Sequence, residues 1–256
     1  MDVKEAVERA YREGRALLAV NMVNLETAQG VVWGAERVGR PIILMVSHNA
    51  ARYGGLEELY AIGRSLGRKA NVPVYLHYDH AKGLDDLEAA YALGFDSAML
   101  EVEDEGEVEA ARRVAGPRAL EVELEVVGKG ERRETVRALG ELARLAALSG
   151  ADWLVVNLGT QHKALEPHRL NLKRLEELRF LGRPLVLHGG SSAHLEDLRE
   201  AVRRGVAKVN VATAGFHAFT EGVRERVGEG LDPRVYLGEG RERLTRWVAA
   251  FYGSLP

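Results

Sequence analysis

The sequence predicts an α/β protein, in the form of a (β/α)8 or TIM barrel with one extra helix at each end. Short apolar segments alternate with segments of helical periodicity along the chain, and eight such pairs follow one another with short connections. Most of the apolar segments are apolar throughout, which is typical of parallel strands that are covered by helices. The length of 256 residues fits as well, because a barrel of this kind needs about 250 residues.

The first half of the chain contains an opening amphipathic helix, over about residues 2–13, and then four strand–helix units. The strands are expected at residues 16–20, 41–47, 72–78 and 97–101. The helices that follow them are expected at residues 26–39, 56–67, 84–94 and 108–115. The first strand ends in Asn21-Met22-Val23-Asn24 rather than in a glycine-rich phosphate turn, which argues against an open doubly wound sheet.

The second half repeats the pattern four more times and ends in one additional helix, at residues 240–252. The strands are expected at residues 119–127, 153–158, 184–187 and 206–211, and the helices at residues 135–149, 172–181, 195–204 and 213–227. Glycine-rich segments at residues 128–130 and 228–240 are interpreted as turns. No linker or change of composition divides the chain, so residues 1–256 are expected to form a single domain.

Composition excludes several classes of function. The formal net charge of -3 and the pI near 6.3 provide no broad cationic surface for nucleic acid. The chain has no cysteine, so a metal site would have to use histidine and carboxylate ligands. No apolar run approaches the roughly 20 residues that span a bilayer, and the first residues do not resemble a signal peptide, so we expect a cytoplasmic protein without a membrane partner.

Polar residues follow nearly every predicted strand. In a (β/α)8 barrel the carboxyl ends of the strands surround the active site, so these residues are expected to form one site. They are Asn21, Asn24, Ser47, His48, Asn49, Asp79, His80, Glu101, Glu123, Glu125 and the polar residues within segments 157–162, 188–192 and 210–213.

Three histidines stand at the ends of the third, sixth and seventh predicted strands. A single histidine beside a strand is commonly structural, but His80, His162 and His188 together offer three nitrogen ligands to one metal ion and leave a coordination position open. Asp79 precedes His80 directly and supplies an acid at the same edge. Four other histidines are interpreted as structural, namely His77, His168, His194 and His217, whereas His48 is left open.

An anion-binding loop is predicted at the seventh strand end. The segment His188-Gly189-Gly190-Ser191 precedes a helix, and glycines allow backbone N–H groups to approach a bound anion closely. Asn210 and Thr213, at the next strand end, are expected to complete this site. Strands 7 and 8 carry the usual phosphate site of the barrel, so a phosphorylated substrate is predicted.

Taken in order, these motifs resemble the class II, zinc-dependent dihydroxyacetone-phosphate aldolases, the fructose-bisphosphate and tagatose-bisphosphate enzymes, and the tagatose branch more closely. The resemblance covers nearly the whole chain. The matching segments are residues 21–29, 41–47, 72–80 and 121–123, Gly159-Thr160 with His162, and residues 187–191, 208–213, 232–236 and 251–254.

The resemblance implies roles for individual residues. His80, His162 and His188 would bind one catalytic Zn²⁺, with Glu123 as a carboxylate beside the metal or an alternative ligand. Asp79 would exchange a proton with the aldehyde oxygen. The implied substrate and phosphate contacts are Asn21, Ser47, Gly159, Lys163, Gly189, Gly190, Ser191, Asn210 and Thr213. A monovalent cation, Na⁺ or K⁺, and a homodimer or homotetramer with Arg234 near its interface are also implied.

The implied reaction is the reversible cleavage of a ketose bisphosphate, fructose 1,6-bisphosphate or tagatose 1,6-bisphosphate, into dihydroxyacetone phosphate and an aldehyde such as glyceraldehyde 3-phosphate. This is a lyase reaction of carbohydrate metabolism, of the kind used in glycolysis. Zinc would polarise the ketone and stabilise the charge of the enediolate, so no Schiff-base lysine is needed.

Three positions depart from the family pattern. The loop after the fifth strand is shortened to residues 128–134, where Glu131 is the expected acid or base on the enediolate carbon and Glu134 the alternative. Lys163 and Ser192 replace glycines beside the phosphate and cation site. Lys163 could itself supply the positive charge of the monovalent cation.

Two other functions remain open. One is a related metal-dependent lyase or isomerase that acts on another phosphorylated substrate, because the shortened loop alters the substrate contacts. The other is a sugar-phosphate-binding barrel without activity. An intact Asp79 beside intact ligands argues against the second, since binding alone does not need the acid. The stereochemistry that separates fructose from tagatose substrates is left open.

Overall fold

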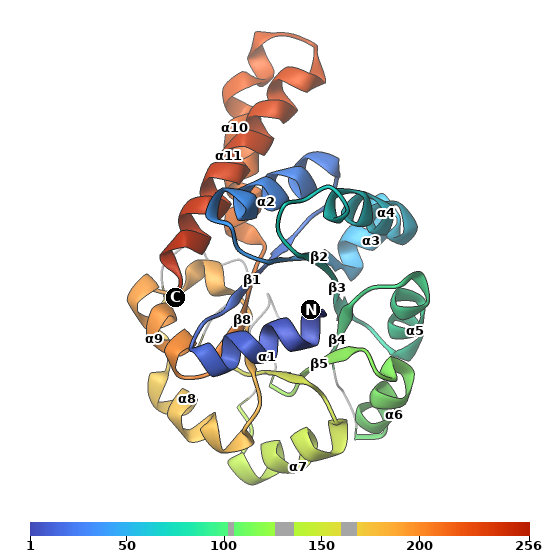
Figure 1. Cartoon of the computed structure of the whole chain (residues 1–256), viewed down its shortest axis with the longest axis vertical. Helices are drawn as coiled ribbons and strands as arrows, with labels where there is room; N and C mark the ends of the chain where they lie inside the picture. Colours follow the sequence, from blue (N-terminus) through green and yellow to red (C-terminus); the bar gives the residue numbers. More distant parts are fainter. Residues whose placement is uncertain (102–104, 126–135, 160–167) are drawn as a thin grey trace.

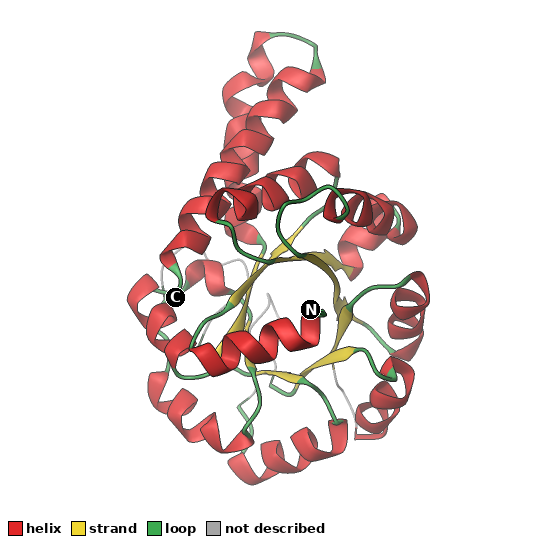
Figure 2. Cartoon of the chain, viewed as in Figure 1, coloured by secondary structure: helices red, strands yellow, loops and turns green. Residues whose placement is uncertain are grey.

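The computed structural model describes residues 1–101, 105–125, 136–159 and 168–256. Eight strands pair in parallel and close in sequence order into a barrel, which confirms the predicted (β/α)8 fold (Figure 1). The strands form an inner ring, and the helices surround it (Figure 2). Among the described residues no helix is both long enough and apolar enough to cross a membrane.

The strands are short, and most helices follow a strand directly. The strands are β1 (Leu17–Asn21), β2 (Ile42–Ser47), β3 (Val74–Ala81), β4 (Ser97–Glu101), β5 (Ala119–Glu123), β6 (Trp153–Val155), β7 (Leu185–Leu187) and β8 (Val206–Val211). The helices are α1 (Val3–Glu13), α2 (Leu25–Val38), α3 (His48–Gly54), α4 (Leu56–Gly67), α5 (Leu84–Leu93), α6 (Glu105–Ala115), α7 (Leu139–Ser149), α8 (Leu172–Leu178), α9 (Leu195–Arg203), α10 (Thr213–Arg226) and α11 (Pro233–Ser254). Short 3-10 turns are η1 (Arg179–Leu181), η2 (Gly190–Ser192) and η3 (Val227–Glu229).

Helix α1 lies across the amino-terminal mouth of the barrel (Figure 1). It begins in a capping box, in which the Asp2 side chain accepts from the backbone of Glu5 and Glu5 reaches back to Asp2. Its apolar face, with Val3 and Val7, packs against side chains that point into the barrel, such as Leu17 at the start of β1. Because α1 closes the amino-terminal end of the barrel, the barrel interior is open to a ligand only at the other end, where the strands have their carboxyl ends.

The strands divide the core into two parts. Along β1, Leu17 and Ala19 belong to the cluster inside the barrel, whereas Leu18 and Val20 belong to the larger cluster between the sheet and the helices. This alternation follows from the two-residue repeat of a strand. Both clusters are almost fully buried, so burial of each large apolar side chain contributes about 1.5–3 kcal/mol to the stability of the fold.

The interpretation of residues 228–240 as a turn is wrong beyond Asp232. Helix α11 begins at Pro233, with the Asp232 side chain accepting from the backbone N–H of Arg234 and proline at the first helical position. The glycines of α10 and α11 instead permit close packing of the two helices. A Cβ on Gly240 would lie 2.9 Å from Phe219 O, and a Cβ on Gly222 would lie 2.7 Å from Glu239 O.

Smaller differences concern element ends. Helix α3 was not predicted; it begins directly after β2, where the hydroxyl of Ser47 accepts from the backbone N–H of Ala50. Helix α7 begins at Leu139 rather than at residue 135, and β5 ends at Glu123. Figure 1 shows that α10 and α11 extend together beyond the ring of helices as an antiparallel pair.

Arg40 ties the end of the chain to the barrel. Its Nη1 donates to the carbonyls of Tyr252 (3.0 Å) and Leu255 (2.9 Å), and its Nη2 to those of Ala16 (3.1 Å) and Pro256 (2.7 Å). The guanidinium also lies 4.1 Å from the ring centre of Tyr252.

We expect Arg40→Met to lower the free energy of unfolding by about 2–3 kcal/mol, because hydrogen bonds from a charged donor are lost together. Urea titration of both proteins measures the change. Arg37→Met is the control, since Arg37 pairs with Glu242 on the surface at 2.7 Å and such pairs contribute at most about 1 kcal/mol. Equal stability of the two variants would contradict the expectation.

Candidate functional site

A bulge at the end of β3 places two consecutive side chains in the barrel. Tyr78 pairs with Ala98 and Ala81 with Leu100, so β3 carries one residue more than β4 over this stretch. His80 has a φ of 62°, the left-handed region, and it is the one non-glycine residue of the described chain with a positive φ. In a regular strand Asp79 and His80 would point to opposite faces, whereas the bulge turns both inward.

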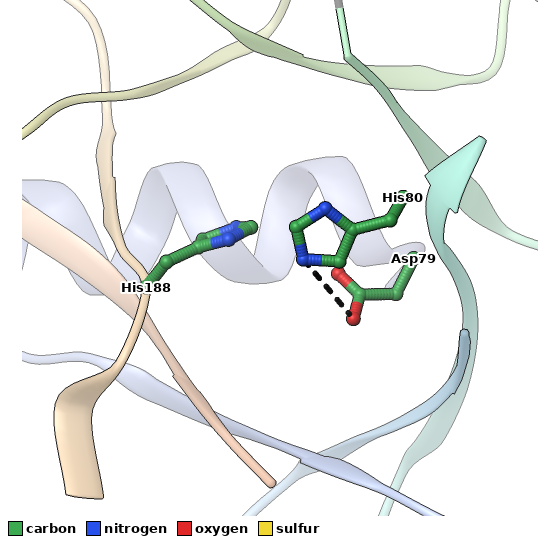
Figure 3. Close-up of side chains that lie close together, drawn as sticks. All are labelled: Asp79, His80 and His188. Carbon is green, nitrogen blue, oxygen red and sulfur yellow. Dashed lines mark ion pairs between the residues drawn. The ribbon is translucent and has the colours of Figure 1, made fainter. Parts of the chain in front are cut away.

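Asp79, His80 and His188 meet at the carboxyl ends of β3 and β7 (Figure 3). One ligand atom from each lies within 4.8 Å of the others, and all three side chains are buried. His80 Nε2 is 3.9 Å from Asp79 Oδ2, and the two imidazole rings stand edge to face with centres 5.1 Å apart. Two imidazole nitrogens and a carboxylate oxygen are donors that zinc accepts.

Asp79 is ionised at neutral pH. Burial raises the pKa of Asp79, whereas the charges of His80 and His188 lower it. The charge of Lys208 and a hydrogen bond from Asn21 Nδ2 (3.2 Å) lower the pKa further, to about 2. No hydrogen-bond partner within the described part of the chain reaches Asp79 Oδ1, although this atom is buried. One carboxylate oxygen is therefore held by Asn21, and the other accepts no hydrogen bond from the described residues.

Each of these two histidines contacts a glutamate that is paired with a lysine. His188 Nε2 lies 3.1 Å from Glu121 Oε1, and Glu121 Oε2 accepts from Lys208 Nζ at 2.7 Å. His80 Nδ1 lies 2.7 Å from Glu101 Oε1, and Glu101 Oε2 accepts from Lys82 Nζ at 2.5 Å. His80, Glu101 and Glu123 form a second buried group whose ligand atoms lie within 4.8 Å of one another.

A cavity of about 330 Å³ lies over the strand ends. The structure brings Asp79, His80 and His188 to its wall together with six predicted substrate contacts. These are Asn21, Ser47, Gly189, Ser191, Asn210 and Thr213. A volume of this size is typical of a small-molecule site.

The predicted anion-binding loop has the geometry that its glycines suggest. Gly189 adopts a φ of 65°, which favours glycine, and a Cβ on Gly190 would lie 2.5 Å from Val209 Cγ1. The loop therefore turns tightly against β8. Thr213 is the first residue of α10, a helix of 14 residues, and so contributes the N–H groups and partial positive charge of a helix N-terminus to the same cavity.

Other predicted site residues lie elsewhere or cannot be placed. Gly190 is buried within the loop and does not line the cavity. Gly159 is exposed and does not belong to the described lining either. Glu123 is buried beside His80 and Glu101 rather than at the cavity wall. The remaining three predicted residues lie outside the described residues: Glu131, His162 and Lys163.

The sequence prediction did not assign roles to Lys82, Lys208, Glu101 or Glu121. A signal for the buried pair was present, since Lys208 and Glu121 are charged residues inside predicted strands, yet both have zero exposure in the structure. Lys82 gave no such signal, because it follows a strand, where a lysine is ordinary.

His48 and His77, two histidines outside the predicted ligand set, have different surroundings. His48 lines the cavity, and its Nδ1 lies 2.8 Å from Asp86 Oδ2 and 3.3 Å from the Tyr78 hydroxyl. Burial, followed by the charge of Asp86, raises the pKa of Tyr78. His77 is fully buried with Nδ1 2.8 Å from Ser97 Oγ, as suits a structural residue.

Fold and site together define a barrel protein with a metal-competent centre beside an anion-binding loop. The family model described as fructose-bisphosphate aldolase class-II matches residues 1–255, so the chain belongs to the class II fructose-bisphosphate aldolase family. It is therefore a lyase of the metal-dependent aldolase class, which typically uses zinc and acts on phosphorylated substrates.

Similar proteins match nearly the whole length of the chain. The fructose-bisphosphate aldolase of Geobacillus stearothermophilus is 33% identical over 270 residues, which cover 97% of this chain and 94% of that protein. The sulfofructosephosphate aldolase of Alkalicoccus urumqiensis is 32% identical over 263 residues, with coverages of 94% and 91%.

Solved structures show the same fold. The fructose-bisphosphate aldolase of Campylobacter jejuni has a TM-score of 0.81 and 25% identity, covering 99% of this chain and 93% of that one. The YdjI aldolase of Escherichia coli K12 has a TM-score of 0.87 and 24% identity, with coverages of 99% and 97%, and shows likeness of fold alone.

The described residues fit a zinc ion. The two imidazole donors, His80 and His188, are buried and close together, and the carboxylate of Asp79 lies beside them. Asp79 Oδ1 is also buried without a hydrogen-bond partner in the described part of the chain, as expected beside a bound ion or substrate.

Proposed function

We propose that this protein reversibly cleaves fructose 1,6-bisphosphate or tagatose 1,6-bisphosphate into dihydroxyacetone phosphate and glyceraldehyde 3-phosphate. One observation carries the proposal: a single cavity joins the cluster of Asp79, His80 and His188 to the anion-binding loop at Gly189 and Ser191. The fructose-bisphosphate aldolase name of the Geobacillus stearothermophilus relative supports the choice of substrate.

His80 and His188, with His162 from outside the described residues, are proposed to hold the zinc ion. Bound zinc would polarise the ketone oxygen of the substrate and so stabilise the negative charge of the enediolate. Glu123 stands close enough to His80 to serve as an alternative ligand.

Asp79 acts on the aldehyde half of the substrate. Its carboxylate removes the proton of the hydroxyl group as the adjacent C–C bond breaks, the hydroxyl carbon becomes the aldehyde, and the electron pair of the broken bond passes into the ketone half. In the direction of synthesis Asp79 returns the proton to the aldehyde oxygen. Its low pKa, about 2, keeps the carboxylate ionised at neutral pH, and Asn21 fixes its orientation.

The phosphate of the ketone half binds at Gly189, Ser191 and Thr213, which fixes the distance from the phosphate to Asp79. Asn210 lines the same cavity and contacts His188, since its amide nitrogen is 2.9 Å from His188 Nε2. Ser47 lines the cavity at the end of β2 and is proposed to contact the substrate as well.

Further roles are proposed on the resemblance alone. Glu131 would return a proton to the enediolate carbon, and the positive charge at the phosphate would come from a Na⁺ or K⁺ ion or from Lys163 itself. Gly159 and Gly190 are proposed as further contacts to the substrate phosphate. A homodimer or homotetramer with Arg234 near the interface is the proposed assembly.

Removal of zinc is expected to abolish cleavage of both bisphosphates, and added zinc to restore it. A coupled assay of dihydroxyacetone phosphate, run before and after treatment with a chelator, measures this. Normal activity of the metal-free protein would contradict the proposal.

Comparing fructose and tagatose bisphosphates with sulfofructose phosphate separates the substrates, because a relative named for the last is about equally similar. If the zinc-loaded protein binds phosphorylated sugars but cleaves none of the three, the barrel is a binding protein or acts on another substrate.

A further inference from the structure

The two described metal-competent histidines present different ring nitrogens to their glutamates. His188 meets Glu121 through Nε2, and His80 meets Glu101 through Nδ1. We propose that the pairs Lys208–Glu121 and Lys82–Glu101 are positioning residues that fix opposite tautomers. The lone pairs facing the metal are then on Nδ1 of His188 and on Nε2 of His80. This inference rests on the proposed zinc site.

The Lys208–Glu121 pair spans the interior of the barrel from β8 to β5. Both side chains have zero exposure, and their charged atoms are 2.7 Å apart. A buried carboxylate stays ionised only when a cation or strong donors compensate it, and the ammonium does so here. An ionised Glu121 cannot donate, so it accepts from His188 Nε2–H at 3.1 Å. With its proton on Nε2, the neutral ring carries its lone pair on Nδ1.

The Lys82–Glu101 pair fixes the tautomer of His80 in the same way, at the rim of the barrel. Glu101 is buried, while the side chain of Lys82 is 48% exposed. Glu101 accepts from His80 Nδ1–H at 2.7 Å, which leaves the lone pair on Nε2. Nε2 is the nitrogen that lies 3.9 Å from Asp79 Oδ2, on the side of the cluster with His188. Carboxylates that accept from a metal-binding histidine commonly fix its tautomer in this way.

Asn210 provides the competing contact. Its Nδ2 lies 2.9 Å from His188 Nε2, and an amide donating there would require the lone pair on Nε2. The contact to Glu121 is charge-assisted and therefore stronger. A half turn of the amide also places Asn210 Oδ1, which has no partner in the described residues, next to the N–H. Both contacts are then satisfied by the same tautomer.

Nitrogen NMR of the zinc-free full-length protein tests the tautomers directly. Long-range ¹H–¹⁵N correlation at a pH where the rings are neutral separates protonated from lone-pair nitrogens, with assignment by His80→Asn and His188→Asn. We expect Nε2–H for His188 and Nδ1–H for His80. The reverse tautomer at either residue would overturn the inference there. This measurement needs neither metal nor activity, so it can fail while the proposed function stands.

Two charge-neutral double variants test the pairs. Lys208→Met/Glu121→Gln and Lys82→Met/Glu101→Gln should each give mixed tautomers at their own histidine and reduce zinc affinity by about 10–100-fold in competition with a chromophoric chelator. The conservative variant Lys82→Arg keeps the positive charge and should retain both the single tautomer of His80 and the native zinc affinity.

The surface pair gives the matched control, because Arg37→Met/Glu242→Gln removes the same charges away from the site. Should the inner variant fail to fold, the tautomer of His188 in the native protein still tests the inner pair, and the rim variant tests its own pair because Lys82 is half exposed. Unchanged tautomers and zinc affinity in a folded double variant would refute the role of that pair.

Discussion

His188→Ala will lose its tightly bound zinc and cleave ketose bisphosphates at least about a thousandfold more slowly than the native protein. His188 is 1% exposed and follows β7 directly, so the variant loses a buried imidazole donor of the proposed zinc site. A metal that polarises a carbonyl contributes several kcal/mol to the transition state, which corresponds to a factor of about 10³ or more.

Metal analysis and kcat/KM of the purified variant measure both effects. His217→Ala is the control, because His217 is exposed on α10 and was interpreted as structural. The variant that loses His217 should keep its metal and its rate. Full activity and full zinc content in His188→Ala would remove this histidine from the proposed ligand set.

The barrel could be predicted because its signals are local. Each strand is an apolar run of a few residues, and each helix repeats its apolar positions, so neighbouring residues carry the information. The bulge in β3 could not be predicted, since it depends on how β3 pairs with β4. The turn predicted over residues 228–240 was wrong beyond Asp232 for a similar reason. Glycines such as Gly222 and Gly240 allow close packing of α10 and α11, which is a contact between distant segments.

The site was predictable where barrel geometry gathers strand ends. Asp79, His80 and His188 are far apart in sequence, yet the rule that carboxyl ends share one edge places them together. The lysine–glutamate pairs follow no such rule. Lys208 and Glu121 are 87 residues apart and meet inside the barrel only because of the register of β5 and β8 around it. A charged residue within an apolar strand predicts that a partner of opposite charge exists, but the sequence does not show which residue it is.

Asp79→Asn should separate proton transfer from metal binding. Asparagine has the same shape but cannot accept the hydroxyl proton, so cleavage should slow by about 10²–10⁴-fold, while His80 and His188 still bind zinc. The ketone half does not use Asp79 in the proposed mechanism. Exchange of the dihydroxyacetone phosphate C–H proton with deuterated water should therefore continue at nearly the native rate.

Glu131→Gln supplies the complementary variant, with slow exchange as its expected defect. Measuring cleavage by coupled assay and exchange by proton NMR on the same zinc-loaded samples compares the two steps directly. If exchange falls in parallel with cleavage in Asp79→Asn, then Asp79 also acts on the ketone half, and its role is not confined to the aldehyde oxygen. Retained exchange instead assigns Asp79 to the aldehyde oxygen alone. A residue that acts only there leaves proton exchange on dihydroxyacetone phosphate unchanged when it is replaced.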